Sequence, residues 1–494
     1  MARIVLFTPP YHSGVVEAAI KCPPLGLVTI AGGLRAAGHE VEIYDAMMKD
    51  HTHQETVQRI LARAPDFVGT GAYTASIPDA LAVLKDVKAA RPETVTLLGG
   101  IHANFCYEEL LGNAAVDYVV RGEGELTTPE LVEAVERDLS EVRGIAFRDG
   151  GSVVVTPERP FIEDMEVLEP AWDLLDWEDY TIYIIPGSRV GLVGSSRGCL
   201  FGCSFCSQQK FWKQTYRQRT AEAFVAEIEM LAGTYGVDVF LLSDELPTRD
   251  RGRWEKILDL LIEKDLGVFL MMETRVSDVL RDQDILHKYR SAGIVHIYVG
   301  VESTDQATLD RFNKSLAVQD SKKALDLLNA AGIITECSFV VGLPEETHDS
   351  LDRTYELALE YDPDFAHFLL LAPWPYADMY RELKDFIVAD DYRSYNFVRP
   401  VIKPESMEAE ELLDRIIEFY KDYYRRKLMA SKEQPDRFKR EYMVRSIKVL
   451  LERSFLKDSI AQMGPFPRIV NQFLEEIVEG PEGSVFEPRQ VSTL

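Results

Sequence analysis

Residues 197–206 read RGCLFGCSFC, directly after a short β-rich run. Cys199, Cys203 and Cys206 therefore stand on one tight loop at the end of a predicted strand. Three thiolates so spaced can bind three irons of a [4Fe–4S] cubane and leave the fourth iron without a protein ligand. A structural zinc ion would need a fourth ligand, and the next histidine along the chain is His287. The spacing therefore favours the cubane over zinc.

The sequence around this loop alternates strand-like runs with helix-length segments. Six such units at this spacing predict a partial (β/α)6 barrel, in which the chemistry lies at the carboxyl ends of the strands. The six predicted strands are Arg189–Val193, Val239–Ser243, Val268–Met272, Ile297–Gly300, Thr335–Val341 and His367–Leu371.

A second strand and helix series precedes the loop and predicts a parallel, doubly wound sheet. Its predicted strands are Arg3–Phe7, Glu40–Tyr44, Asp66–Gly71, Val95–Gly99 and Asp117–Val120. Sheets of this kind bind ligands at the carboxyl ends of their strands. Small, turn-forming residues follow these strands, and we expect a ligand site there.

The chain is therefore predicted to be an α/β protein of three units. A Rossmann-like domain occupies residues 1–150, and a Pro- and acid-rich linker follows at 151–187. The barrel domain spans 188–385, and residues 386–494 form a helical, aromatic C-terminal domain.

Composition limits the partners and the compartment. The net charge of −27 disfavours nucleic acid and anionic lipid, because such a surface repels phosphate. No window approaches the ~20 apolar residues of a membrane span, and no secretory signal is evident. Six cysteines in 494 residues form no disulfide framework. We expect a cytoplasmic protein that binds neither nucleic acid nor membrane.

The cysteine loop and the segments after the later strands resemble the radical S-adenosylmethionine (SAM) superfamily. The resemblance implies that the open iron chelates SAM and cleaves it to a 5′-deoxyadenosyl radical. It assigns Ser243 and Glu245 to the methionine amino group, although the usual Gly-Gly-Glu is absent, and Arg275 to the SAM carboxylate. The further residues implied to contact SAM are Phe205, Glu302, Ser303 and Gly342.

The N-terminal domain resembles the cobalamin-binding domain fused to many radical SAM enzymes. Glycine pairs at the strand ends would allow close approach of the nucleotide tail. The residues implied to line the cobalamin site are His12, Tyr73, Thr74, Gly99, Gly100, His102, Gly122, Glu123 and Gly124. The Asp-x-His-x-x-Gly motif that supplies a cobalt ligand elsewhere is absent. We expect His12 to line the corrin site without binding cobalt, the alternative being that it is the ligand.

Over about residues 1–430 the chain resembles the anaerobic magnesium-protoporphyrin monomethyl ester oxidative cyclase and related C-methyltransferases. The segments that carry this resemblance are residues 11–14, 206–212, 274–278 and 373–376. It implies methyl transfer to an unactivated carbon of a small molecule or protein, for example glutamine or arginine of methyl-coenzyme M reductase. Porphyrin cyclisation is the alternative. A ferredoxin or flavodoxin would supply electrons. A third hypothesis, a carrier or sensor without catalysis, conflicts with the full set of SAM motifs.

Trp374 and Tyr376 follow the sixth predicted barrel strand, within residues 373–376, which read PWPY. This loop should stand at the same barrel mouth as the cysteines, where rigid aromatic groups could keep water from a radical. Packing of the C-terminal helices is the equal alternative for these two residues.

Overall fold

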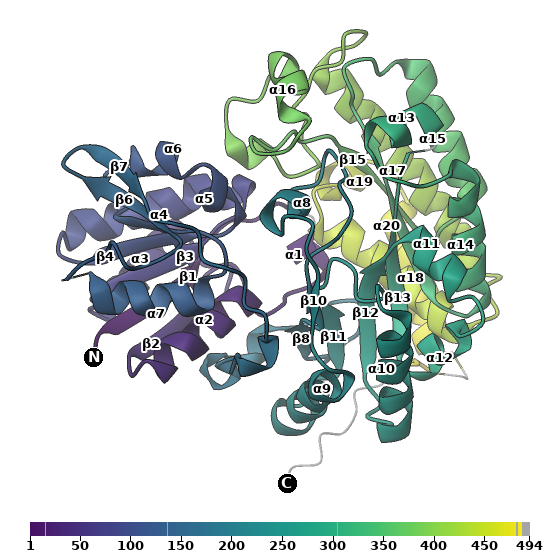
Figure 1. Ribbon diagram of the computed structural model, residues 1–494. Coiled ribbons are helices and arrows are strands. Elements are labelled where there is room, and N and C mark those ends of the chain that lie inside the picture. The colour runs from purple at the N-terminus through teal and green to yellow at the C-terminus, as the bar shows by residue number, and fades with distance from the viewer. Residues whose placement is uncertain (15, 136, 304, 481–482, 487–494) are drawn as a thin grey trace.

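The computed structural model describes residues 1–14, 16–135, 137–303, 305–480 and 483–486. Two main sheets organise the chain, a mostly parallel one in an N-terminal lobe and a fully parallel one in a barrel (Figure 1). The predicted α/β architecture, with a Rossmann-like domain, a partial barrel and a helical C-terminal region, is confirmed.

The N-terminal sheet has the strand order β2-β1-β3-β4-β5-β6-β7. Its strands are β1 (Arg3–Thr8), β2 (Glu40–Asp45), β3 (Phe67–Gly71), β4 (Val95–Gly99), β5 (Tyr118–Val120), β6 (Ile145–Asp149) and β7 (Ser152–Val155). Strands β1 to β5 are parallel, whereas β6 and β7 add antiparallel pairs. The order reverses between β1 and β3, which makes the carboxyl ends of these two strands the natural ligand crevice.

Helices cover both faces of this sheet, as its apolar strands require. One face carries α2 (Leu25–Ala36) and α7 (Gly124–Ala134), which bury Leu34 and Leu131 against it. The other face carries α3 (His53–Ala62), α4 (Ile77–Ala90), α5 (Ile101–Phe105) and α6 (Tyr107–Leu111). The short helix α1 (Val16–Ala19) lies between the two lobes (Figure 1).

The barrel sheet is fully parallel, in the order β15-β14-β13-β12-β11-β8. Its strands are β8 (Val190–Val193), β11 (Val239–Leu242), β12 (Phe269–Thr274), β13 (Ile294–Glu302), β14 (Ile334–Val341) and β15 (Phe365–Leu370). The helices that follow them are α9 (Ala221–Tyr235), α10 (Arg251–Lys264), α11 (Val276–Arg281), α12 (Leu286–Ser291), α13 (Gln306–Arg311), α14 (Val318–Ala330) and α15 (His348–Tyr361). Sequential neighbours in one parallel sheet are what six βα units predict.

Local sequence signals set where these helices begin and end. Helix α9 begins where the Thr220 side chain accepts a hydrogen bond from Ala223 N at 3.2 Å, and it ends at Gly236 with φ +68°. A hydroxyl cap at the first turn and a left-handed glycine at the last satisfy backbone groups that the helix leaves unpaired.

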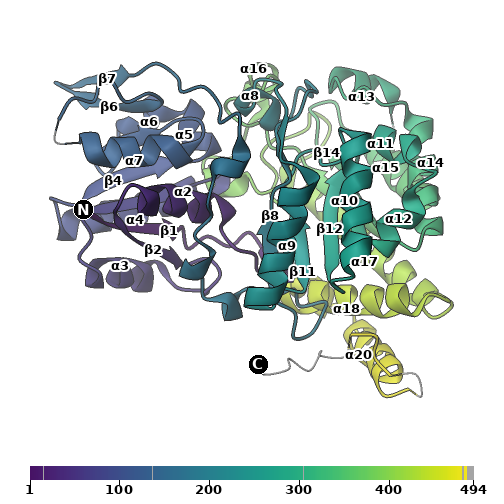
Figure 2. The ribbon, with the colours of Figure 1, turned by 60° about the horizontal axis from the view of Figure 1, so that its bottom comes forward.

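The C-terminal region adds further helices, of which α17 packs against β15 at the free edge of the barrel sheet. They are α16 (Tyr380–Leu383), α17 (Ala409–Ser431), α18 (Arg437–Arg453), α19 (Lys457–Ala461) and α20 (Phe466–Val478). The Tyr420 hydroxyl of α17 accepts a hydrogen bond from Phe368 N at 2.9 Å, and Lys439 of α18 donates to Asp364 at 3.1 Å. Edge groups that would otherwise be open are thus paired. Figure 2 shows α18 and α20 at the end of the barrel away from α16.

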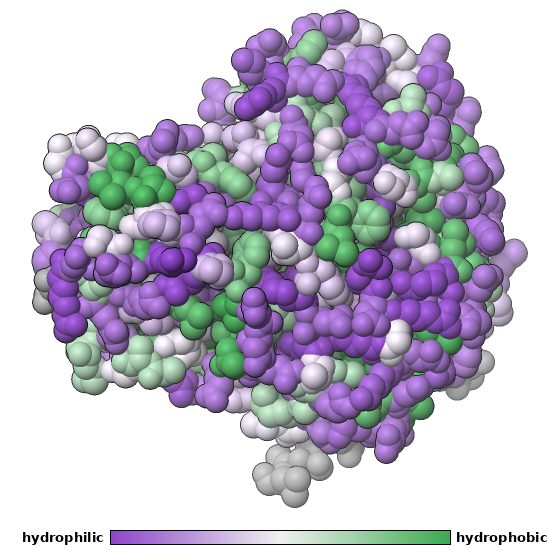
Figure 3. Space-filling model, in the orientation of Figure 1, coloured by the Kyte–Doolittle hydropathy of each residue, from purple (hydrophilic) through white to green (hydrophobic). Residues whose placement is uncertain are grey.

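The view in Figure 3 shows a largely hydrophilic surface with scattered apolar patches. Among the described residues, no helix is both long and apolar enough to cross a membrane.

Candidate active site

The cysteine loop begins at the small hairpin of β9 (Ser196–Arg197) and β10 (Arg217–Gln218). Gly198 has φ +96°, and a Cβ there would lie 2.2 Å from the carbonyl oxygen of Thr215, so only glycine fits. Gly198 N donates to Glu245 Oε2 at 2.9 Å, and Ser204 N donates to Phe312 O at 2.9 Å. The loop is therefore held at both ends before any metal binds.

The three cysteines fit a cubane better than a single ion. Cys203 is buried, and Cys199 and Cys206 are half-buried. Within the described ranges, His102, Cys106 and Glu109 make the one group of three or more ligand atoms that all lie within 4.8 Å of one another, so the loop cysteines are spread more widely. Thiolates that each bind a different iron need such separation, whereas one zinc ion draws its ligands close.

Burial raises the pKa of the Cys199 thiol, and that of Cys206 to about 11. These thiols are therefore protonated at neutral pH before metal is loaded, and binding iron must displace their protons.

Arg275, at the end of β12, lies against the cysteine loop. Its guanidinium stands 3.6 Å from the centroid of the Phe201 ring, and Nη1 donates to Cys203 Sγ at 3.9 Å. Nη2 donates to the carbonyl oxygen of Lys314. A cation held beside one thiolate suits an anionic group bound at the cluster.

The carboxylate of Glu302 ends β13 in a polar network. Its Oε1 accepts from Lys314 Nζ at 2.6 Å and its Oε2 from Ser338 Oγ at 3.3 Å. Glu302 has φ +66°, a conformation that non-glycine residues rarely adopt and that often marks functional sites. A Cβ on Gly300 would lie 2.6 Å from both Glu302 Oε1 and Lys314 Nζ, which explains the glycine there.

The other residues expected to contact SAM lie around this mouth. Ser303 Oγ accepts from Asp305 N at 3.1 Å, and Gly342 N donates to Glu346 Oε2 at 3.1 Å. Phe205 packs edge-on against Phe312, with ring centroids 5.1 Å apart. Their contacts with SAM stay predictions.

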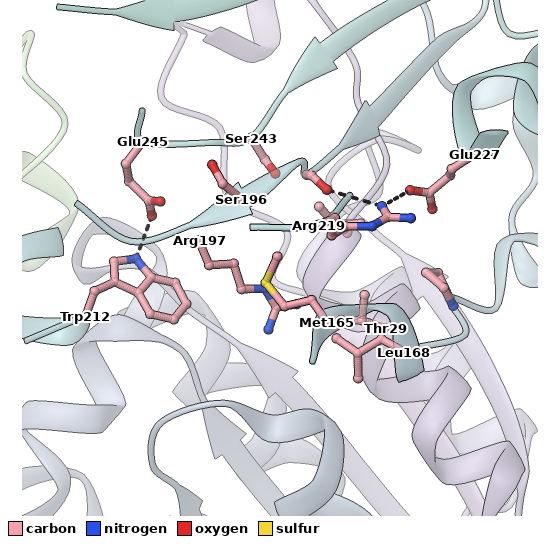
Figure 4. A pocket seen from close by; sticks show the side chains of 13 residues that line it. Thr29, Met165, Leu168, Ser196, Arg197, Trp212, Arg219, Glu227, Ser243 and Glu245 are labelled. Atoms are coloured by element: carbon pink, nitrogen blue, oxygen red, sulfur yellow. Dashed lines mark hydrogen bonds and ion pairs between the residues drawn. The ribbon is translucent and has the colours of Figure 1, made fainter. Parts of the chain in front are cut away.

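Ser243 and Glu245 follow β11 and line a cavity of about 150 Å³ beside the linker and α2 (Figure 4). This volume is too small for a nucleoside-sized ligand, since ligand pockets run from about 300 Å³ upward. Ser243 Oγ donates to Val193 O at 3.3 Å. Glu245 accepts from Gly198 N and, at 2.6 Å, from Trp212 Nε1, so its carboxylate anchors the cysteine loop. Contact of either residue with SAM stays a prediction.

At the switch point of the N-terminal sheet, Tyr73 is the exposed side chain. It follows β3, its side chain is 72% exposed, and desolvation by the surrounding protein raises its pKa. His12 follows β1 at the same edge and is exposed as well.

The glycines of this edge have different reasons to be glycine. A Cβ on Gly100 would lie 2.7 Å from Ala72 O, a backbone atom that cannot yield, so glycine is required there. One on Gly124 would lie 2.9 Å from Ile30 Cδ1, the end of a flexible side chain that can move aside. Gly122, with φ +76°, has open space on its side-chain face, and its N–H donates to Asn104 Oδ1 at 2.8 Å. A Cβ on Gly99 would meet only ordinary contacts, the nearest at 3.7 Å. Gly122 is the glycine best suited to close ligand approach.

Thr74, His102 and Tyr376 connect the two lobes. Thr74 Oγ1 lies 3.0 Å from the Tyr376 hydroxyl and 3.1 Å from His102 Nδ1. The His102 ring is 0% exposed, and burial lowers its pKa to about 4, so it is neutral at pH 7. Tyr376 stacks on Phe105 of α5, with centroids 4.9 Å apart, and Trp374 lies parallel to Tyr376 at 6.5 Å. The loop after β15 is thus joined to the carboxyl edge of the N-terminal sheet.

Glu123 is engaged by the barrel rather than turned to open space. It is 6% exposed and accepts from Arg197 and Arg217, both of the β9–β10 hairpin. Sequence reasoning missed Arg197, Arg217 and Trp212, although all three lie within 15 residues of the cysteine motif, which is the signal that could have found them.

Two further residues near the barrel strand ends were also missed. The buried Lys314 carries the ion pair with Glu302, and no local motif points to it. Glu273 lies near the end of β12, and desolvation, followed by the Glu245 charge, raises its pKa to about 7. Glu273 precedes Arg275 at the end of β12, and that position is the signal for it.

Comparison with known proteins agrees with this geometry. A family profile described as "B12 binding domain" matches residues 11–132, and one described as "Radical SAM superfamily" matches residues 193–358. The anaerobic magnesium-protoporphyrin IX monomethyl ester cyclase of Rubrivivax gelatinosus is 40% identical over 464 residues, which cover 92% of this chain and 83% of that protein. The chain belongs to the cobalamin-dependent radical SAM enzymes.

Two further relatives of this radical SAM enzyme widen the comparison. An uncharacterised methyltransferase of Pyrococcus horikoshii is 28% identical, over 87% of this chain and 94% of that protein. The solved structure of the cobalamin-dependent SAM radical enzyme OxsB, with aqua-cobalamin and SAM bound, matches with a TM-score of 0.72 at 16% identity. The match covers 98% of this chain and 76% of that one, and it shows a shared fold. The cofactors of this enzyme are a [4Fe–4S] cluster, SAM and cobalamin.

Proposed function

We propose that this enzyme transfers a methyl group to an unactivated carbon of its substrate. One contact carries the proposal: the 3.0 Å hydrogen bond between Tyr376, at the barrel mouth, and Thr74, at the cobalamin edge. A substrate beside this contact would be within reach of both cofactor sites. When bound, the cluster and SAM would supply a 5′-deoxyadenosyl radical, and cobalamin would supply a methyl group.

The chain's own residues then have separate tasks. Cys199, Cys203 and Cys206 would hold the cluster, and Arg275 would place a positive charge beside it. The rings of Trp374 and Tyr376 exclude water from the reacting carbon, since a radical must be kept from side reactions. Tyr73 and His12, both exposed at the carboxyl ends of the N-terminal strands, would line the cobalamin site, His12 without binding cobalt.

Oxidative cyclisation of a porphyrin such as magnesium-protoporphyrin IX monomethyl ester is the second candidate. The observation in its favour is the 40% identity to the Rubrivivax cyclase over 92% of this chain. The methyltransferases among the relatives support methyl transfer, although at lower identity. A protein substrate, such as glutamine or arginine of methyl-coenzyme M reductase, and a small molecule are both compatible with methyl transfer. In either case a ferredoxin or flavodoxin supplies the electrons.

One anaerobic experiment separates the candidates. The reconstituted protein is given a reductant, SAM labelled in its methyl group, and either magnesium-protoporphyrin monomethyl ester or a panel of small molecules and peptides. Methyl transfer predicts a product that carries the labelled methyl group, together with 5′-deoxyadenosine. A cyclised porphyrin without label would establish the second candidate instead.

The cluster-free Cys199→Ala variant is the control, because it keeps the fold but has no site for SAM cleavage. If the wild-type enzyme forms no more 5′-deoxyadenosine than this variant, catalysis is refuted and a carrier role remains. Electron paramagnetic resonance of bound cob(II)alamin tests the lower face separately. Nitrogen splitting that disappears in His12→Ala would make His12 the cobalt ligand, against our proposal.

A further inference from the structure

Two arginines of the β9–β10 hairpin bind two glutamates of the N-terminal lobe. Arg197 Nη1 donates to Glu123 Oε1 at 2.6 Å, and its Nη2 donates to Glu125 Oε1 at 2.7 Å. Arg217 Nη1 donates to both carboxylate oxygens of Glu123 at 3.0 Å. We call these four residues the clasp.

The clasp is buried, unlike most ion pairs of this chain. Glu123 and Glu125 are 6% and 5% exposed, and Ile162 N also donates to Glu123 Oε2 at 2.6 Å. Two cations meet two carboxylates, so their charges balance. A planar guanidinium that spans two fixed carboxylates defines direction as well as distance, which a surface pair with mobile side chains does not.

On the barrel side, the clasp connects directly to the cysteine loop. Arg197 lies two residues before Cys199, and its backbone pairs with that of Arg217 across the hairpin. The intervening Gly198 is fixed by its contact with Thr215 and by the hydrogen bond to Glu245. The barrel end of the clasp is therefore rigidly joined to the first cluster ligand.

On the other side, the clasp connects to the cobalamin edge. Glu123 follows Gly122, the glycine with open space on its side-chain face, and it is the residue before α7. Glu125 lies in the first turn of α7, whose partner α2 is packed so closely that a Cβ on Gly33 would lie 2.3 Å from Glu125 O. Both carboxylates therefore belong to the rigid part of the N-terminal lobe.

We infer that the clasp fixes the position of the [4Fe–4S] cluster relative to the corrin, with Arg197 as the positioning residue. The inference rests on the proposed function only in supposing that both cofactors serve one substrate. Glu123 on this account contacts the cysteine hairpin, not cobalamin. Losing the clasp should leave both cofactors bound but let the two sites move relative to each other.

The test measures geometry, not turnover. The variants Arg197→Gln and Glu125→Gln are reconstituted with cluster and cob(II)alamin, and the cluster is reduced. The dipolar interaction between the two paramagnetic centres, measured by pulsed electron paramagnetic resonance, reports the distance between them. We expect both variants to contain as much iron and cobalamin as the wild type, but to show a broader distribution of distances. The broadening should be smaller in Arg197→Lys, which keeps the positive charge but loses the two-pronged guanidinium.

A matched control is available in a second contact between the lobes. Arg393 donates to both oxygens of Asp79 at 3.0 Å but does not touch the cysteine loop. Asp79→Asn should leave the distance distribution narrow. Equal broadening in Asp79→Asn, or a narrow distribution in Glu125→Gln, would overturn the inference. If Arg197→Gln loses its cluster, Glu125→Gln still decides the question, because Glu125 lies on the other lobe.

The outcome is independent of the proposed reaction. A broadened distance in the variants supports the clasp even if no methylated product is ever found. Conversely, methyl transfer by the wild-type enzyme with unchanged distances in the variants would confirm the function and refute the clasp.

Discussion

The side chains at the carboxyl ends of the strands differ between the barrel sheet and the N-terminal sheet. At the barrel mouth, functional side chains gather on one loop and the strand beside it: Cys199, Cys203 and Cys206 lie on the loop, and Arg275 donates to Cys203 Sγ. At the N-terminal edge, most polar side chains turn to other parts of the protein, as Glu123 does toward Arg197. Tyr73 is exposed, and Gly122 has open space on its side-chain face.

This difference matches the two ligands. An iron cluster needs covalent side-chain ligands at fixed positions, whereas cobalamin is large and can be held by a shaped surface with close backbone approach. The barrel site can therefore be recognised from a sequence motif, whereas the N-terminal site depends mainly on the shape of the folded surface. The four predictions below test this division.

The largest expected effect is on the cluster. Cys199→Ala, Cys203→Ala and Cys206→Ala should each abolish it, because two thiolates do not hold a cubane stably. Iron and sulfide contents and visible absorption of the reconstituted variants measure this. Cys337→Ala is the control. Cys337 is buried in the barrel core, away from the cysteine loop, so this variant should keep the iron content of the wild type. Retention of a full cluster in any loop variant would remove the assignment.

The second prediction concerns His102, which is buried at the carboxyl end of the N-terminal sheet and pairs with Thr74. Its pKa is about 4 in the fold and about 6.5 when unfolded, so the unfolded chain binds more protons between these values. The contribution of neutral His102 to the free energy of unfolding is therefore complete above pH 6.5. As the pH falls toward 4, the protein loses about 3 kcal/mol of this stability.

Chemical denaturation of the cofactor-free protein from pH 4 to pH 7 measures this. His102→Asn should flatten the slope relative to wild type, while replacing the exposed His287 by Asn should not. Equal slopes for wild type and His102→Asn would show that the imidazole charges freely in the fold.

The features that could be predicted from the sequence follow the same division between the two sites. The cysteine loop was predictable because its ligands are contiguous, and β4 was predicted at the residues it occupies, Val95–Gly99. Contacts such as Thr74 with Tyr376 were not predictable, because 302 positions separate the partners and only domain docking joins them. Strands β6 and β7 were missed, and β7 lies within the predicted linker, although Gly150-Gly151 between them is a hairpin signal.

The third prediction tests backbone approach at the N-terminal edge. Gly122→Ala should cost about 1 kcal/mol from its left-handed conformation, and its methyl group would enter the open space there. We expect cobalamin affinity to fall about tenfold, which corresponds to about 1.4 kcal/mol. Equilibrium titration with cobalamin measures it.

Gly38→Ala provides the control. Gly38 also has a positive φ, +83°, and open space around it, but it precedes β2 and so lies at the amino ends of the strands, away from the expected cobalamin site. It should lose similar stability and keep wild-type affinity. If both variants lose affinity equally, the effect is strain alone and Gly122 does not face the ligand.

The smallest expected effect is at the contact that joins the two edges. Tyr376→Phe removes only the hydroxyl that bonds Thr74, so the loss in free energy of unfolding should be about 1 kcal/mol. Both cofactors should still bind, because the ring keeps its stacking on Phe105. Without the bond, the loop should close less often over the substrate, so that SAM cleavage outruns product formation. The ratio of 5′-deoxyadenosine to product measures this.

The matched control is Tyr395→Phe, because Tyr395 is buried in the same segment and its ring contacts Trp374. That variant should leave the ratio unchanged. Replacing Trp374 by Phe should raise the ratio as Tyr376→Phe does, since it thins the aromatic layer over the mouth. If the ratio stays at its wild-type value in both Tyr376→Phe and the Trp374 variant, these rings only pack the loop against the N-terminal lobe. The substrate would then have to be screened from water by other residues of the barrel mouth.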